Sequence, residues 1–271
     1  MGHAIILRIV NNFNTNNSII TLALMGNESV SINGIIILGN AVPDEISDNR
    51  KTVCTVGYSK ELGLIRIYPV PPDAKMNRWE IVGLNLERNP QDTRKESWKI
   101  TGSKSNWSSL KETIRREGKV AKRGDQLKII DLMMEKYGVG CISELNERRE
   151  SLGFVNPTIL KYYFAKRSKV DNSIQNTLFN TEPFQTIRNY ELQPRLVYSC
   201  PQCAGKKHHD QQILEWGAYE YIRKNPEDYE KIWENLKLDS IEYKKRLLVG
   251  NQALYRNSFM VISIFRNKIS I

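Results

Sequence analysis

The segment 32–87 constrains the fold more than any other part of the chain. It holds four short, partly alternating runs rich in Ile, Val and Leu, at 32–39, 51–58, 62–70 and 78–87, with Pro, Gly, Asp and Asn between them. Short β-branched runs bounded by turn residues are typical of strands in a small twisted sheet. Closing such a sheet on itself removes its exposed edges, so the pattern favours a compact β-barrel.

The pattern changes at about Ser105. Residues 105–119, 124–138 and 141–153 each repeat apolar residues with a helical period, with a capping residue near the start and a glycine near the end. These are the start, stop and periodicity signals of helices. We therefore expect a helical segment over 105–153.

Strands and helices occupy separate stretches of the chain. In the second half, the expected strands are 158–167, 190–200, 244–251 and 257–267, the expected helices are 209–225 and 226–237, and a loop is expected over 171–186. This segregation favours an α+β architecture over βαβ winding.

The chain is strongly basic, with a net charge of +10 at pH 7 and an isoelectric point near 9.3. From Arg94 to Lys128, eleven Lys and Arg residues outnumber four acids, which gives this segment a net charge of +7. Such an excess favours a polyanionic partner, nucleic acid first and an anionic membrane surface second. The ordinary alternative is a solvated helix whose charge only adds solubility.

Aromatic residues are interleaved with the basic ones. Lys and Arg neutralise phosphates and release counterions, and exposed rings stack on unpaired bases. Within 62–70, Arg66 and Tyr68 would share the outer face of a strand if Ile65 and Ile67 point into the barrel. We therefore predict a nucleic-acid-binding set made of Arg66, Tyr68, Arg94, Trp98, Lys99, Arg115, Arg116, Lys119, Lys122 and Arg123.

Another group of chemically distinctive residues is Cys200-Pro-Gln-Cys203, which is followed by His208 and His209. A C-x-x-C turn brings two thiolates to one tetrahedral ion, and one of the histidines would add a third ligand. The fourth ligand would come from Cys54, Cys141, Asp210 or the second histidine. We predict a structural zinc site here; the alternatives are a disulfide, a redox pair or inert core cysteines.

Motifs for nucleotide hydrolysis and acyl transfer are absent, since the sequence holds no GxxxxGK[ST], no GxGxxG after a strand and no GxSxG. Asp92, Glu96 and Lys99 approach the D…ExK spacing of nucleases, but Glu96 and Lys99 stand three residues apart rather than two. We expect a protein that is not an enzyme. A metal-dependent nuclease using Asp92 and Glu96 is the weaker alternative.

The longest apolar runs, 35–38 and 259–265, are far shorter than the roughly 20 residues that cross a bilayer. The first residues carry no basic leader in front of an apolar run. We expect no transmembrane segment and a cytoplasmic location.

Several phrases of the sequence occur in order: "IILGNAVPDE", "KTVCTVG", "GLIRIYPVP", "RWEIVGLNLERNPQDTRKESWKI", "HDQQILEWGAYEYIRKNP" and "LVGNQALYRNSFMVI". Together they resemble the prokaryotic dual-OB-domain proteins, over residues 35–265. The resemblance implies two small OB-like β-barrels and a role in holding nucleic acid, and it offers no catalytic residues. A further likeness is to accessory proteins that partner a short Argonaute in archaeal antiviral defence.

Pattern and resemblance together predict an α+β fold: two small OB-like β-barrels with a helical layer between them and helices before the C-terminal strands. The expected divisions are an N-terminal extension or hairpin (1–30), a first OB-like domain (31–104), a helical segment (105–153) and a second, mixed β/α OB-like domain with the zinc site (154–271). The expected function is a nucleic-acid-binding scaffold or accessory subunit of a prokaryotic defence complex. A further alternative is a protein-interaction module that docks an acidic partner.

Overall fold

The computed structural model of the protein describes residues 29–46, 50–167, 184–203 and 207–269. The N-terminal extension expected over 1–30 and the loop expected over 171–186 lie almost entirely outside these residues. In the described part of the chain, no helix has the length and apolar character needed to span a membrane.

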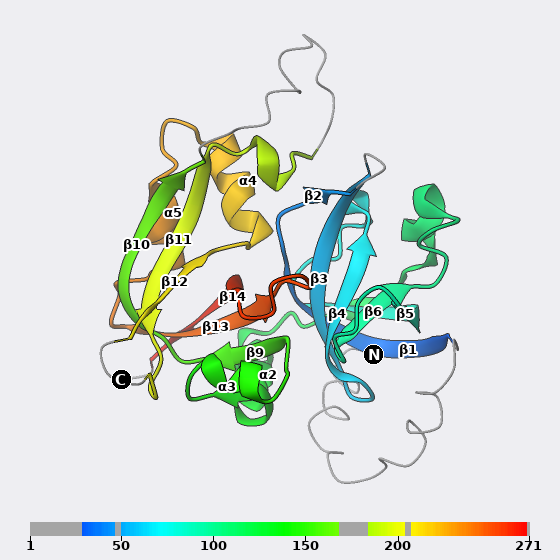
Figure 1. Ribbon diagram of the computed structural model, residues 1–271, viewed down its shortest axis with the longest axis horizontal. Helices are drawn as coiled ribbons and strands as arrows, with labels where there is room; N and C mark the ends of the chain where they lie inside the picture. The colour runs from blue at the N-terminus through cyan, green and yellow to red at the C-terminus, as the bar shows by residue number, and fades with distance from the viewer. Residues whose placement is uncertain (1–28, 47–49, 168–183, 204–206, 270–271) are drawn as a thin grey trace.

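Five strands close into a barrel in the N-terminal half (Figure 1). They are β1 (Val30–Asn40), β3 (Lys51–Ser59), β4 (Gly63–Val70), β5 (Glu80–Arg88) and β6 (Ser97–Ile100). The order is β1-β3-β4-β6-β5, and β5 pairs back with β1, which closes the sheet. Strands β4 and β6 are parallel, whereas the other neighbours are antiparallel. The four strands predicted over 32–87 are confirmed, and the barrel is consistent with a small OB-like fold.

The segment that follows the barrel is less helical than expected. Helices α2 (Arg123–Tyr137) and α3 (Ser143–Glu147) lie where helices were predicted. The helix predicted over 105–119 is wrong, because a 3-10 helix, η3 (Trp107–Thr113), gives way to strand β7 (Arg115–Lys119). Strand β7 pairs antiparallel with β5. Backbone hydrogen bonds with β5 stabilise the strand. They outweigh the intrinsic helix propensity of these residues, which contributes little free energy.

The C-terminal half contains two sheets, with the orders β14-β13-β9-β8 and β10-β11-β12. Their elements are β8 (Gly138–Val139), β9 (Leu152–Val155), β10 (Thr158–Lys166), β11 (Leu192–Ser199), β12 (His209–Gln212), β13 (Tyr243–Asn251) and β14 (Phe259–Lys268), with helices α4 (Trp216–Lys224) and α5 (Lys231–Leu236). The four strands predicted here are confirmed. The helix predicted from residue 209 begins only at Trp216, because the residues before it pair with β11.

The second OB-like barrel stays a prediction. In the described residues the two C-terminal sheets are joined by the bridge between Ile213 and Val261, and they are two sheets rather than one closed barrel. Three short elements complete the fold: β2 (Asp44–Glu45), which pairs with β3, and the 3-10 helices η2 (Pro72–Ala74) and η5 (Ile187–Asn189).

The barrel and the C-terminal half share a hydrophobic core. Ile35 and Ile37 of β1 fill the barrel interior, whereas Ile36 and Leu38 pack in a second core together with Met133 of α2 and residues of β13 and β14. Strand β1 is therefore covered on both faces, which is why its sequence is a continuous apolar run. Figure 1 shows β13 and β14 lying between the barrel and the three-stranded sheet.

Candidate metal centre and basic surface

Four potential metal ligands, Cys141, Cys200, Cys203 and His209, lie together where β11 ends and β12 begins. Their ligand atoms are all within 4.8 Å of one another. Cys200 and Cys203 occupy the turn after β11, and His209 is the first residue of β12. Cys141 comes from the segment between β8 and α3, so the cluster joins two distant parts of the sequence.

The separations between these atoms fit a tetrahedral ion. The Cys141 sulfur lies 3.8 Å from the Cys203 sulfur and 3.6 Å from Nε2 of His209, and the Cys203 sulfur lies 3.2 Å from the same nitrogen. Zinc–sulfur bonds of about 2.3 Å and zinc–nitrogen bonds of about 2.0 Å at tetrahedral angles place ligand atoms about 3.5–3.8 Å apart. The three thiols and one imidazole could therefore supply the four ligands of a tetrahedral ion.

The surroundings of the cluster favour the metal-binding form of the histidine. Burial and the neighbouring His208 lower the pKa of His209, so the imidazole stays neutral near neutral pH. Burial raises the pKa of Cys200. Burial also acts to raise the pKa of Cys141, but hydrogen bonds with Ser143 and the two other thiols lower it overall. A bound cation would favour the thiolate form of all three cysteines.

The structure distinguishes between the ligands that the sequence left open. Cys141 takes the fourth position, whereas Cys54, Asp210 and His208 do not belong to the cluster. Asp210 is ion-paired with Arg195 at 2.8 Å, and His208 is exposed. Of the two histidines predicted as ligands, His209 belongs to the cluster and His208 does not. All four cysteines are free in this structure.

Three of the predicted nucleic-acid-binding residues are buried. Arg66, Arg94 and Trp98 are only 5%, 8% and 4% exposed. Arg94 forms an ion pair with Asp92 at 2.5 Å, and the guanidinium of Arg88 lies 3.8 Å from the centroid of the Trp98 ring. Arg94 and Trp98 therefore contact neighbouring side chains rather than an open phosphate-binding surface, contrary to expectation, whereas Arg66 points outward from the barrel and lines a cavity.

Two further predicted cations have acidic partners. Lys99 lies 2.8 Å from Glu87, and Arg116 lies 2.5 Å from Glu80. Their charges are largely compensated, so they add little to an attraction for phosphate. Tyr68 is half-buried and lines a cavity together with Arg66.

The remaining predicted cations, Arg115, Lys119, Lys122 and Arg123, are exposed and have no acidic partner within ion-pair distance among the described residues. We call these four residues the basic edge, because β7 is an edge strand and α2 begins directly after it. Arg115 donates to neutral oxygen atoms only, and Arg123 donates to the carbonyl of Arg266. Lys119 and Lys122 have no partner in the part of the chain that the structure describes.

Asp92 and Glu96, the acids of the nuclease alternative, belong to two separate hydrogen-bond networks. Both oxygens of Asp92 accept from Arg94, and Oδ2 also accepts from Ser97 at 2.6 Å. Glu96 accepts from the backbone N–H and the hydroxyl of Ser151 at 3.0 and 2.9 Å. Neither acid belongs to the group of potential metal ligands found in the described residues.

Asp92→Asn is expected to lower the free energy of unfolding at neutral pH by about 2 kcal/mol. Burial acts to raise the pKa of Asp92, but hydrogen bonds from Arg94 and Ser97 hold it at about 2. Because this value lies below the unfolded pKa of about 3.9, the stabilisation is complete above about pH 5 and is lost as the pH falls towards 2. Urea unfolding at about pH 7 and about pH 3 measures both effects. A variant with the acid sensitivity of the parent would contradict this assignment.

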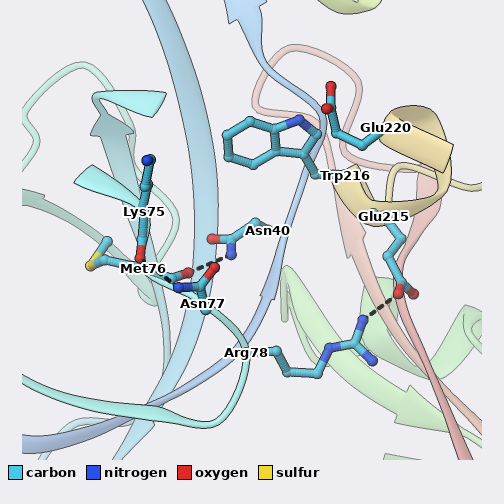
Figure 2. Close-up of a pocket in the computed structure, with 9 residues that line it drawn as sticks. Asn40, Lys75, Met76, Asn77, Arg78, Glu215, Trp216 and Glu220 are labelled. Atoms are coloured by element: carbon cyan, nitrogen blue, oxygen red, sulfur yellow. Dashed lines mark hydrogen bonds and ion pairs between the residues drawn. The ribbon is translucent and has the colours of Figure 1, made fainter. Parts of the chain in front are cut away.

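A cavity of 320 Å³ lies between the barrel and α4 (Figure 2). Lys75 and Arg78 line it from the barrel side, and Glu215 and Trp216 line it from the side of α4. Arg78 is ion-paired with Glu215, whose second oxygen accepts from the backbone N–H of Ile264 at 2.9 Å. The pair links the barrel to β14, and its opposite charges cancel within the cavity.

Part of the chain matches a known domain family. Residues 31–128, which contain the barrel and the basic edge, match a family described as a domain of unknown function (DUF8758). No curated protein matches. A solved structure of a murine DNA-binding protein bound with double-stranded DNA aligns with 90% of this chain and 100% of its own, at 9% identity and a TM-score of 0.29. A TM-score this low does not show a common fold.

Proposed function

We propose that this chain is a non-catalytic nucleic-acid-binding scaffold that recognises phosphates through the basic edge. The proposal rests on four exposed cations that form no ion pair with a carboxylate in the described residues. Cations of this kind bind the phosphate backbone by releasing counterions and do not read the base sequence. The barrel supports them on an edge strand and on the first turn of a helix.

We propose zinc as the ion held by Cys141, Cys200, Cys203 and His209. Thiolates and imidazole are the ligands that zinc prefers, and four protein ligands leave no position for a reactive water. Such an ion would cross-link the segment before α3 to the turn between β11 and β12. Its role would therefore be to stabilise the C-terminal half.

We further propose that the scaffold is an accessory subunit of a prokaryotic defence complex. A short Argonaute is the partner that the sequence resemblance suggests, and that resemblance is the support for this part of the proposal. Purification of the tagged chain from its native host, with mass spectrometry of proteins and sequencing of attached nucleic acid, tests it. A stoichiometric acidic protein without nucleic acid would favour the protein-interaction alternative.

Strand binding is expected to weaken steeply as salt rises. Four phosphate contacts predict a slope of about −3 to −4 when the logarithm of the binding constant is plotted against that of the salt concentration. Electrophoretic mobility shifts at about 50 to 200 mM NaCl measure the slope. An affinity that does not change with ionic strength would contradict a phosphate-based mode of binding.

Labelled DNA and RNA are expected to stay intact during incubation with Mg²⁺ or Mn²⁺. The carboxylates of Asp92 and Glu96 are occupied by Arg94, Ser97 and Ser151 and do not converge on one ion. Gel analysis of both substrates gives the measurement. Cleavage that disappears in Asp92→Asn would replace the scaffold with the nuclease alternative.

A further inference from the structure

A second cavity, of 410 Å³, lies between strand β4 of the barrel and the connection from β13 to β14. Arg66 and Tyr68 line it from the barrel, and Leu254, Tyr255 and Met260 line it from the other side. Its volume lies within the range of small-molecule sites. The two halves of the chain thus build one cavity whose walls differ in chemistry.

The barrel wall carries a buried cation, Arg66, that forms no ion pair in the described residues. The guanidinium of Arg66 donates to the Cys54 sulfur at 3.3 Å and to the Ser151 carbonyl at 3.1 Å. Its Nε has no partner. A guanidinium has more N–H donors than these two contacts use, and buried charges normally have an ionic partner. Glu96 accepts hydrogen bonds from Ser151, and no ion pair joins it to Arg66 in the described residues.

The backbone around this cation is shaped to accommodate it. A Cβ atom at Gly250 would lie 3.0 Å from Nη2 of Arg66 and 2.5 Å from Ile262, so a larger residue would force the guanidinium to move. The neighbouring residue, Asn251, accepts from Arg94 through its backbone carbonyl at 2.7 Å. Because Arg94 is neutralised by Asp92, it fixes the position of the β13 end without adding free charge.

Tyr68 adds a neutral hydrogen-bond donor to the same wall. Burial raises the pKa of Tyr68 to about 12, so its hydroxyl keeps its proton at neutral pH. This hydroxyl has no hydrogen-bond partner in the part of the chain that the structure describes. Asp44, which also lines the cavity, is paired with Arg188 at 3.3 Å, and Arg94 is paired with Asp92, so Arg66 is the charged lining residue without an ion pair in the described residues.

The opposite wall combines exposed apolar side chains with the polar Asn251 and Gln252. Leu254 is 89% exposed and Tyr255 is 66% exposed, although large apolar side chains are usually covered. Both line the cavity, as does Met260. A ring that stacks on Tyr255 and packs against Leu254 would cover this surface.

We infer that the cavity binds a single nucleotide unit, with its phosphate at Arg66 and the Tyr68 hydroxyl and its base against Tyr255 and Leu254. The cation, the neutral donor and the apolar wall match the phosphate and the planar base of a nucleoside monophosphate. The unit is either a free nucleotide or the terminal residue of a bound strand. The choice of a nucleotide over another planar anion rests on the proposed function. The geometry of the cavity is independent of that function.

Isothermal titration with the four nucleoside monophosphates, the corresponding nucleosides and inorganic phosphate tests the inference. At least one monophosphate should bind about tenfold or more tightly than its nucleoside and than phosphate. Competition by a strand with a terminal phosphate, compared with the same strand without it, distinguishes the terminal residue from the free nucleotide. Absence of binding by every monophosphate overturns the inference.

Variants of both walls make the test specific. Tyr68→Phe removes only the hydroxyl and should weaken monophosphate binding about tenfold, and Arg66→Met should weaken it further. Leu254→Ser should also weaken it, whereas Ile241→Ser, an equally exposed residue outside the cavity, should not. Because Arg66→Met alters a buried contact, the melting temperature of this variant is measured as a control. If Arg66→Met does not fold, Tyr68→Phe alone tests the phosphate side of the site. Unchanged affinity in both Tyr68→Phe and Leu254→Ser overturns the inference.

Failure of this inference and failure of the proposed function can be separated. Lys119→Glu combined with Lys122→Glu should weaken strand binding and leave monophosphate binding intact, since neither lysine lines the cavity. Strand binding without monophosphate binding would refute the nucleotide site alone. Monophosphate binding without strand binding would refute the basic edge alone.

Discussion

His209→Ala is expected to release the metal and to lower the melting temperature by about 10 °C or more, whereas His208→Ala is expected to leave both unchanged. The two histidines are adjacent, yet only His209 lies among the cysteines, with its Nε2 3.2 Å from the Cys203 sulfur. A structural zinc ion contributes folding free energy directly, so the loss of one ligand weakens both binding and folding. Zinc content by mass spectrometry and melting by calorimetry give the two measurements.

The cysteines provide a second matched pair. Cys203→Ser should behave like His209→Ala, and Cys54→Ser, which changes a thiol outside the cluster, should keep its zinc. A chelator should reproduce the loss in the parent protein and have no further effect on His209→Ala. Purified protein without zinc, or a His209→Ala variant as stable as the parent, would refute the metal centre.

Reversing two charges of the basic edge, Lys119→Glu with Lys122→Glu, is expected to weaken strand binding about 100-fold at low salt. Each substitution removes a cation and places a negative charge near the phosphates. Neither lysine has a partner in the described residues, so the fold should keep its stability, which thermal melting checks. Mobility shifts measure the affinity.

The control for this variant carries the same change in net charge at other places. Lys60→Glu with Lys161→Glu alters exposed lysines in the turn after β3 and on β10. If both double variants weaken binding equally, attraction by the overall charge explains the result and the basic edge is not a site. If the Lys119 and Lys122 variant binds as the parent does, phosphate recognition lies elsewhere.

The barrel could be predicted from the sequence because its signal is local. Alternation in β4 correctly placed Ile65 and Ile67 inside the barrel and put Arg66 and Tyr68 on a shared face, where both line one cavity. The sequence could not show that this face is covered by the connection between β13 and β14. That contact joins residues far apart in the chain, and the local pattern of apolar and polar residues does not predict it.

Strand β7 and the fourth metal ligand also depend on long-range contacts that the sequence does not reveal. The sequence of β7 has no apolar alternation, and it is a strand because β5 offers it backbone hydrogen bonds. Cys141 is one of several residues that could have completed the metal site, and its own neighbours do not single it out. Only the packing of β8 and α3 against the end of β11 brings it to Cys200 and Cys203.

Because strand β1 is covered on both faces, the barrel cannot be separated from the rest of the chain without exposing apolar side chains. Its inward residues face the barrel, and Ile36 and Leu38 face partners supplied by α2, β13 and β14. A fragment limited to the family match at 31–128 would stop within α2 and strip the outer side of β1 of those partners. Such a fragment would leave Ile36 and Leu38 open to water, so the barrel depends on the C-terminal half of the chain to cover its outer side.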